Sequence, residues 1–312
     1  MASEISVIIC AYTNERWADL VAAVASAQGQ TLPPREVIVV CDHNEALLTR
    51  ARGEFHDALV VPNREARGLS GARNSGIAIA QGVLLAFLDD DAIADPDWLE
   101  HLIAVYEDPR VLGVGGAIDP LWQVDKPSWF PDEFYWVVGC TYRGMPTATA
   151  HVRNLFGANM SFRRSAAMVT GGFNSGVGQV GASMLRCDDT DFCIRLRQLL
   201  PECDLLHEPR ARVKHQVPES RARWKYFCIR CYTEGVAKAQ VVRDVGSRDG
   251  LSSEWAYTSR ILPMGVMMHL KQAILHREIG ALVRAAAIIA GLALTTAGYC
   301  YGRTLSWYSR QQ

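Results

Sequence analysis

The chain has 312 residues, of which 49% are hydrophobic and 21% are charged. This composition can form one large core, or one core with an appendage, and it argues against intrinsic disorder. The formal net charge of -1 gives no general attraction to nucleic acid, so an anionic ligand must be held by local groups. We therefore expect a folded protein with no nucleic-acid partner.

Short apolar runs alternate with helical patterns in the first third of the chain. Strands are predicted at residues 5–11, 37–41, 59–61, 83–88 and 111–114. Helices are predicted at residues 17–27, 45–55, 70–80 and 98–106. This alternation predicts an α/β fold, Rossmann-like, with a mainly parallel sheet and crossover helices.

Three carboxylates, Asp89, Asp90 and Asp91, directly follow the predicted strand at residues 83–88. Parallel sheets bind ligands at the ends of their strands, and adjacent carboxylates repel one another unless a cation lies between them. The run predicts a metal site for a phosphate-bearing ligand. The alternative is a solvated acidic loop or a cap on the next helix.

Other predicted strands end at the same edge of the sheet. The first strand leads through Ala11 and Tyr12 to Glu15, and the second ends at Asp42. No G-x-G-x-x-G follows the first strand and no Walker lysine is present, which argues against a dinucleotide enzyme and a P-loop phosphotransferase.

Residues 67–76 combine glycines, a helix start and two arginines. Gly68 and Gly71 allow a close approach of the backbone, and Arg73 could reach a pyrophosphate. The alternative is a glycine-rich turn capped by Ser70.

A second acidic pair, Asp188 and Asp189, opens another helical pattern. Capping explains one carboxylate at a helix start, whereas two beside a ligand site indicate a catalytic base. His215 ends a later apolar run; a lone histidine is usually structural, but here it could complete an oxygen-rich metal site.

Between residues 116 and 150 the regular pattern stops and aromatic residues cluster. They predict either a wall on which a sugar stacks or a small satellite core. Residues 156–164 then predict a strand whose small residues let a ligand lie against the backbone.

Together these ordered motifs resemble the family 2 inverting glycosyltransferases with the GT-A fold. The resemblance implies that the first-strand residues Ala11, Tyr12 and Glu15, with Asp42, bind the nucleotide of a nucleotide-sugar donor. It favours a UDP-sugar, since Asp42 can accept from the imide N–H of uracil, and it leaves guanosine and thymidine nucleotides as alternatives. It also implies that Arg73 and Asn74 match the family's A-R-N stretch and contact the same donor.

In the same family, Asp89 and Asp91 would form the D-x-D pair that binds Mn2+ or Mg2+. The resemblance makes Asp91 the more direct metal ligand, places Asp89 near the ribose or a metal water, and adds Asp90 to the donor-binding residues. His215 would close the metal site. Asp189 stands in the position of the general base, and Asp188 departs from the family pattern, where Glu is usual. The implied reaction is a single displacement onto a hydroxyl of a glycan or lipid-linked acceptor.

The chain changes character beyond His215, with helical patterns at residues 221–242 and 262–275 and an uncharged stretch at 285–301. We expect a GT-A domain at residues 1–218 and a C-terminal helical extension at 219–312. The uncharged stretch predicts a peripheral or partly inserted helix, a full membrane span, or a tail packed on the soluble domain.

The N-terminus shows no secretory signal, so we expect a cytoplasmic enzyme, at the inner face of the cytoplasmic membrane if the C-terminal helices bind lipid. Two rival functions fit parts of the pattern: a nucleotidyltransferase acting on a sugar phosphate, and a non-catalytic glycan or nucleotide-sugar binding protein. Neither explains the second acidic pair as well as sugar transfer does.

Overall fold

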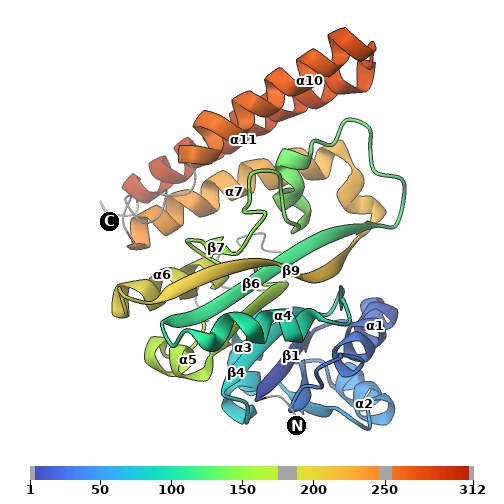
Figure 1. The fold of residues 1–312 in the computed structure, drawn as a ribbon, viewed down its shortest axis with the longest axis vertical. Coiled ribbons are helices and arrows are strands. Elements are labelled where there is room, and N and C mark those ends of the chain that lie inside the picture. The colour runs from blue at the N-terminus through green and yellow to red at the C-terminus, as the bar shows by residue number, and fades with distance from the viewer. Residues whose placement is uncertain (1–3, 175–187, 246–254, 309–312) are drawn as a thin grey trace. The chain divides into compact units, whose positions relative to one another are not determined.

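The computed structural model describes residues 4–174, 188–245 and 255–308 (Figure 1). By contact the chain divides into two compact units. The first comprises residues 1–119 and 146–216, and the second comprises residues 120–145 and 217–312. The segment at 120–145 therefore groups with the C-terminal helices. The division into domains 1–218 and 219–312 stays a prediction.

The strands are β1 (Ile5–Ala11), β2 (Glu36–Cys41), β3 (Leu59–Pro62), β4 (Leu84–Asp89), β5 (Ala92–Ala94), β6 (Val111–Trp122), β7 (Ala150–His151), β8 (Asn159–Arg163) and β9 (Asp204–Val217). The α-helices are α1 (Trp17–Gln28), α2 (Glu45–Glu54), α3 (Leu69–Ile79), α4 (Trp98–Ala104), α5 (Arg164–Thr170), α6 (Asp188–Leu199), α7 (Trp224–Val245), α10 (Leu262–His276) and α11 (Ile279–Tyr308). Short helical turns are η1 (Asn14–Arg16), η2 (Val105–Glu107), η3 (Asp132–Val138), η4 (Glu219–Ala222) and η5 (Tyr257–Ile261).

The strands form one mixed sheet in the order β3-β2-β1-β4-β8-β6-β9-β5, with β7 beside β9. The first four strands pair in parallel, as predicted. The rest of the sheet is antiparallel, because β8 pairs antiparallel with both β4 and β6, and β9 pairs antiparallel with β5 and β7. The strand order depends on pairings between distant segments, which local periodicity does not report.

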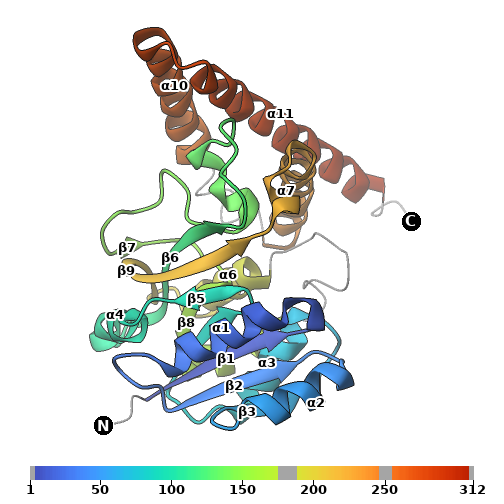
Figure 2. The same ribbon diagram turned by 90° about the vertical axis from the view of Figure 1, so that its right-hand side faces the viewer.

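Helices cover both faces of the parallel strands (Figure 2). Right-handed crossovers place α1 and α2 on one face, and the return from β3 to β4 places α3 on the other. On the α3 face, Ile8 and Val40 lie in a buried core cluster with Phe87 and Phe192. Gly76 lets α3 approach this face, since an added Cβ would lie 2.6 Å from Ile8. The core thus fixes the strand ends that carry the predicted site.

Strand β6 is longer than its predicted range of residues 111–114 and runs to Trp122. Its glycines interrupt the apolar pattern for a packing reason. A Cβ at Gly116 would lie 1.8 Å from the carbonyl oxygen of Ala211, so only glycine allows this approach. Asn159 adds bonds from its Nδ2 to the carbonyl oxygens of Ala117 and Ala211, both 2.9 Å long.

In the second unit, η3 packs with α7 and α11, and its Glu133 lies against Gly265 and His269 of α10. The aromatic residues of the 120–145 segment form a core there, because Trp129, Phe130 and Phe134 all contact the ring of Phe227. Phe130 and Phe227 are fully buried. These contacts favour the satellite-core interpretation of the cluster.

Candidate active site

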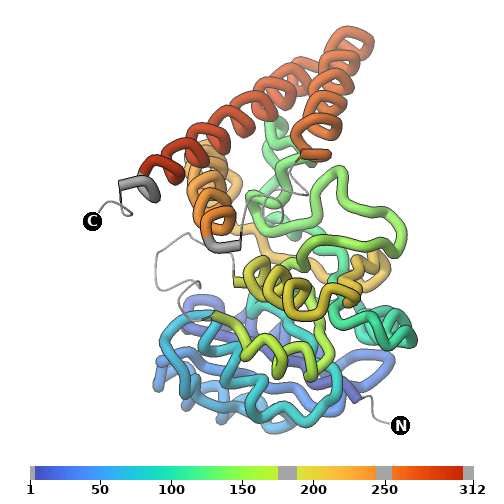
Figure 3. Tube along the Cα trace, turned by 90° about the vertical axis from the view of Figure 1, so that its left-hand side faces the viewer, coloured from blue at the N-terminus to red at the C-terminus, as the bar shows by residue number. Residues whose placement is uncertain are grey.

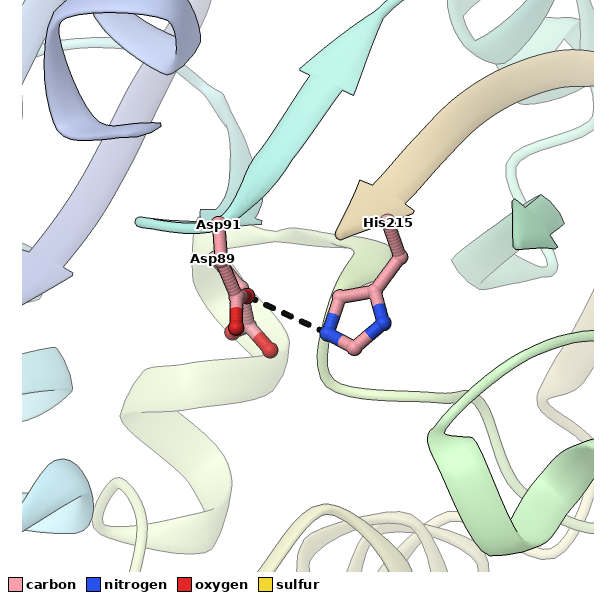
Figure 4. Close-up of side chains that lie close together, drawn as sticks. All are labelled: Asp89, Asp91 and His215. Atoms are coloured by element: carbon pink, nitrogen blue, oxygen red, sulfur yellow. Dashed lines mark ion pairs between the residues drawn. The ribbon is translucent and has the colours of Figure 1, made fainter. Parts of the chain in front are cut away.

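Asp89, Asp91 and His215, which we call the metal cluster, converge on one point of the first unit (Figure 4). Asp89 ends β4, Asp91 lies just before β5, and His215 lies on β9 opposite Ala92. One ligand atom from each side chain lies within 4.8 Å of the others. His215 Nε2 is 3.1 Å from Asp91 Oδ1. The pairing of β5 with β9 therefore brings the histidine to the carboxylates.

The metal cluster fits a hard divalent cation. Two carboxylates and an imidazole offer oxygen and nitrogen ligands of the kind that Mn2+ accepts, and Mg2+ also binds carboxylates. The Oδ2 atom of the neighbouring Asp90 is buried, with no hydrogen-bond partner among the described residues. This local excess of acceptor oxygens is what a cation would stabilise.

Arg16 of η1 offsets part of the negative charge. Its Nη1 is 3.1 Å from Asp90 Oδ1 and 2.9 Å from Asp91 Oδ2. Burial opposes the charged form of Arg16, but Asp91 and Asp90 outweigh it and raise its pKa. Burial, followed by the charge of Asp91, raises the pKa of Asp90 to about 7.

The ends of β1 and β2 place Tyr12 and Asp42. Tyr12 is 51% exposed, and the guanidinium carbon of Arg16 lies 5.6 Å from the centroid of its ring. Asp42 Oδ1 accepts from Asn63 Nδ2 at 2.6 Å, and Oδ2 accepts from the Gly68 N–H at 3.0 Å. Gly68 has a φ of 125°, which favours glycine. The Asp42 carboxylate is therefore held in place, and its contact with a base stays a prediction.

Arg73 of α3 is the buried link between the two acidic motifs. Its Nη1 is 2.7 Å from Asp188 Oδ2, and its Nη2 is 3.7 Å from Asp89 Oδ1. Nη2 also donates to the carbonyl oxygen of Gly157 at 3.3 Å. Burial opposes the charge on Arg73, but Asp188 and Asp89 outweigh it and raise its pKa. The prediction that Arg73 reaches a pyrophosphate is not tested by these contacts.

Asp188 and Asp189 begin α6, as predicted. The Gly157 N–H donates to Asp189 Oδ2 at 3.0 Å, and the Thr190 N–H donates to Oδ1 at 2.6 Å. Burial, followed by the charge of Asp188, raises the pKa of Asp189 to about 6, while Arg73 and the two amides act in the opposite direction. Asp189 is half-buried, and its carboxylate is oriented by the two amides and is more basic than that of an ordinary aspartate.

Three other predicted donor-binding residues have different surroundings. Ala11 is buried at the end of β1, opposite Cys41. Glu15 is exposed on η1. The Asn74 side chain exchanges two 2.8 Å hydrogen bonds with the backbone of Phe173, which ties α3 to the segment after α5. Their contacts with a donor stay predictions.

Sequence reasoning missed Arg16 and Asn63. Arg16 follows the end of β1 and Asn63 follows the end of β3, at the edge of the sheet that carries the acidic residues. Their position after a predicted strand could have identified them. The strand predicted at residues 156–164 begins only at Asn159, so residues 156–158 are not part of it. What lies against Gly157 is the guanidinium of Arg73, since an added Cβ would be 2.5 Å from Nη2.

Comparisons with known proteins show the family of this chain. Residues 6–170 match the model of glycosyl transferase family 2. The chain is 32% identical over 303 residues to the glucosyl-dolichyl phosphate glucuronosyltransferase of Haloferax volcanii, and the match covers 96% of each chain.

Two solved structures share the fold. The mannosyltransferase PcManGT from Pyrobaculum calidifontis, in complex with GDP-Man and Mn2+, is 18% identical with a TM-score of 0.58, covering 95% of this chain and 87% of that one. GalNAc-T7 with UDP, GalNAc and Mn2+ is 20% identical with a TM-score of 0.53 and covers 68% of this chain. This chain spans 44% of the length of that structure.

The mixed sheet, its flanking helices and these structural neighbours define a GT-A fold, as predicted. The chain belongs to glycosyl transferase family 2. Family membership favours sugar transfer over the two rival predictions, nucleotidyl transfer and ligand binding without catalysis.

Proposed function

We propose that this protein is an inverting glycosyltransferase that moves a sugar from a UDP-sugar to a hydroxyl of a lipid-linked glycan. The observation that carries the proposal is the link through Arg73. This one buried guanidinium contacts Asp188, beside the proposed base Asp189, and Asp89 of the metal cluster. Donor activation and acceptor deprotonation would then occur side by side.

In the proposed reaction, an oxygen of the Asp189 carboxylate takes the proton of the acceptor hydroxyl. The hydroxyl oxygen forms a bond to the anomeric carbon while the bond from that carbon to the diphosphate oxygen breaks. The electron pair of the broken bond leaves with UDP, and the configuration at the anomeric carbon inverts. Asp89, Asp91 and His215 would hold Mn2+ or Mg2+, which would supply positive charge for the diphosphate.

The residues around Asp189 support its role as the base. A pKa near 6 leaves the carboxylate ionised at neutral pH, yet more basic than an ordinary aspartate. The amides of Gly157 and Thr190 fix its orientation. Asp188, held by Arg73, would position the start of α6.

The relatives support the choice of substrates. The relative from Haloferax volcanii is named for glucuronosyl transfer to glucosyl-dolichyl phosphate, and the match spans 96% of both chains. We therefore propose a glycosylated polyprenyl phosphate as the acceptor and UDP-glucuronate as the first donor to test. The enzyme would work at the cytoplasmic face of the membrane, with its C-terminal helices in contact with lipid.

The test is a transfer assay with the full chain, Mn2+, a glucosylated polyprenyl phosphate and four donors: UDP-glucuronate, UDP-glucose, UDP-N-acetylglucosamine and GDP-mannose. We expect transfer from a UDP-sugar, loss of transfer in chelator, and an inverted anomeric centre in the product by nuclear magnetic resonance. A retained configuration would contradict the single displacement. Release of pyrophosphate from UTP and a sugar phosphate, without transfer, would contradict the whole proposal.

A further inference from the structure

In the second unit, α10 and α11 form a helical hairpin (Figures 1 and 3). Many of its large apolar side chains are exposed. On α10, the buried positions are Leu262, Gly265 and His269. The exposed large side chains on the same helix are Met264, Met267, Leu270, Ile274 and Leu275. A helix that packs on a core in water normally has the opposite arrangement.

Helix α11 repeats this arrangement. Its buried apolar residues are mostly small, Ala281, Ala285 and Ala287 beside Ile288, whereas Ile279, Leu282, Val283 and Ile289 are exposed. Small residues between helices and large apolar residues outside are typical of helices that face lipid. We call the exposed large apolar residues of α10 and α11 the outer face.

Polar contacts fix the orientation of the hairpin, so it cannot turn its outer face inward without breaking them. His269 Nε2 lies 3.6 Å from Oε2 of Glu133, and both side chains are buried. Arg284 of α11 donates from Nη1 to the carbonyl oxygen of Ser128 at 3.0 Å. Glu133 and Ser128 belong to the 120–145 segment of the same unit.

The charge of the hairpin complements an anionic surface. Residues 262–304 carry four cationic side chains and one carboxylate. Lys271 and Arg277 are exposed near the turn between the helices, beside Ile274 and Ile279 on the outer face. Exposed apolar side chains next to basic ones favour the interface of an anionic bilayer.

Helix α11 could cross a membrane by length and composition, since Ile279–Thr304 has 26 residues and contains an 18-residue window with a mean hydropathy of 1.8. Its packing argues against a span. An added Cβ at Gly298 would lie 2.0 Å from the carbonyl oxygen of Tyr232, and one at Gly235 would lie 2.0 Å from that of Thr295, so α7 and α11 are in close contact.

Helix α7 would therefore have to enter the hydrocarbon together with α11. It carries charged residues along its length, and burying them in lipid is costly. They include Lys225, Arg230, Glu234, Lys238 and Arg243.

We propose that the outer face of the α10–α11 hairpin binds the surface of an anionic bilayer, with its apolar side chains in the interface and neither helix crossing it. This inference rests on the proposed function, because it gives the enzyme access to a lipid-linked acceptor. It selects the peripheral alternative over the full span and the tail packed on the soluble domain.

The test is flotation of the full chain with vesicles of phosphatidylcholine alone and of phosphatidylcholine mixed with phosphatidylglycerol. Wild type should float with the mixed vesicles, and high salt should weaken its binding. The double variant Ile274→Glu/Ile279→Glu changes residues that are 76% and 78% exposed, so it should fold normally. Its partition coefficient should fall by roughly a hundredfold.

Met168→Glu is the matched control, since Met168 is an apolar residue of α5, 74% exposed, in the first unit. It should float as wild type does. No flotation of wild type, equal flotation of the double variant, or resistance to alkaline carbonate extraction would overturn the proposal. A further contrary result would be a wild-type protein that forms a dimer in solution and does not bind vesicles, together with a double variant that is monomeric. The outer face would then be an interface between two copies of the chain.

Calorimetry separates this proposal from the proposed function. The double variant should bind UDP with Mn2+ as tightly as wild type. If wild type floats but transfers no sugar from any donor, the proposed function is wrong and the proposal of a membrane-binding surface is supported. If transfer to a short-chain, water-soluble acceptor persists while flotation fails, the membrane proposal is wrong and the proposed function stands.

Discussion

Replacing Arg73 with methionine should destabilise the protein far more than replacing its partner Asp188 with asparagine. The side chains of Arg73 and Asp188 are 3% and 7% exposed, and Nη1 lies 2.7 Å from Oδ2. Without Arg73, the buried carboxylate of Asp188 would still contact the Ser70 hydroxyl, which lies 3.4 Å from Oδ2. Leaving a buried charge without its partner costs about 3–5 kcal/mol of unfolding free energy.

The asparagine at position 188 would still accept a hydrogen bond, and Arg73 would keep Asp89 and Gly157. Asp188→Asn should therefore cost only about 1–2 kcal/mol. In the double variant no charge is left without its partner at this pair. Its loss of stability should be about 2 kcal/mol smaller than the sum of the two single losses.

Urea denaturation followed by circular dichroism measures all three variants. An exposed pair of the same chemistry, Arg212 with Asp119, provides a control cycle, because its side chains are 46% and 39% exposed and its coupling should be below about 1 kcal/mol. The reasoning is refuted if the stability losses of Arg73→Met and Asp188→Asn add up to the loss of the double variant to within about 0.5 kcal/mol.

The remaining predictions concern the base, the metal cluster and β6. Burial and Asp188 raise the pKa of Asp189, so kcat/KM for transfer should rise as pH increases through about 6 and then level off; a profile already flat from pH 5 would contradict Asp189 as the base. Asp91→Asn should weaken UDP binding in Mn2+ but not in chelator, and equal affinities for wild type and variant in Mn2+ would remove Asp91 from the site. Gly116→Ala should lower the unfolding free energy by about 1–3 kcal/mol, because its Cβ meets the Ala211 carbonyl. Gly53→Ala, with nothing within 4 Å, should not destabilise the protein, and equal losses at the two glycines would contradict the packing argument.

Local signals predicted the parallel half of the fold. β1 was predicted with its observed ends, and β2, β3 and β4 were predicted to within one residue at each end. A buried strand followed by a polar turn can be recognised from consecutive residues alone. The acidic ends of β4 and α6 were visible for the same reason. What local signals do not contain is partner choice. The insertion of β8 between β4 and β6, and the pairing of β9 with β5, depend on contacts between distant segments.

The site shows the same limit. Asp89 and Asp91 form a motif, but His215 reaches them only through the register that places it opposite Ala92. Arg73 was noticed as a cation near the donor, whereas its contact with both acidic motifs requires the tertiary structure.

The packing of the C-terminal helices also could not be predicted from local sequence. The sequence marks residues 285–301 as apolar but does not tell which side of the helix packs inward. That side follows from the close approach of Gly298 and Gly235 at the contact between α7 and α11.

The most direct test of the central claim is single-turnover transfer by Asp189→Asn at saturating donor, beside Asp191→Asn. Asp191 lies in the same helical turn but pairs with Arg195 at 2.8 Å. We predict that Asp189→Asn binds UDP-sugar and Mn2+ as wild type does and loses transfer by roughly a hundredfold or more, the range of a missing general base. Asp191→Asn should keep most of its activity. Transfer by Asp189→Asn at the wild-type rate would contradict the account.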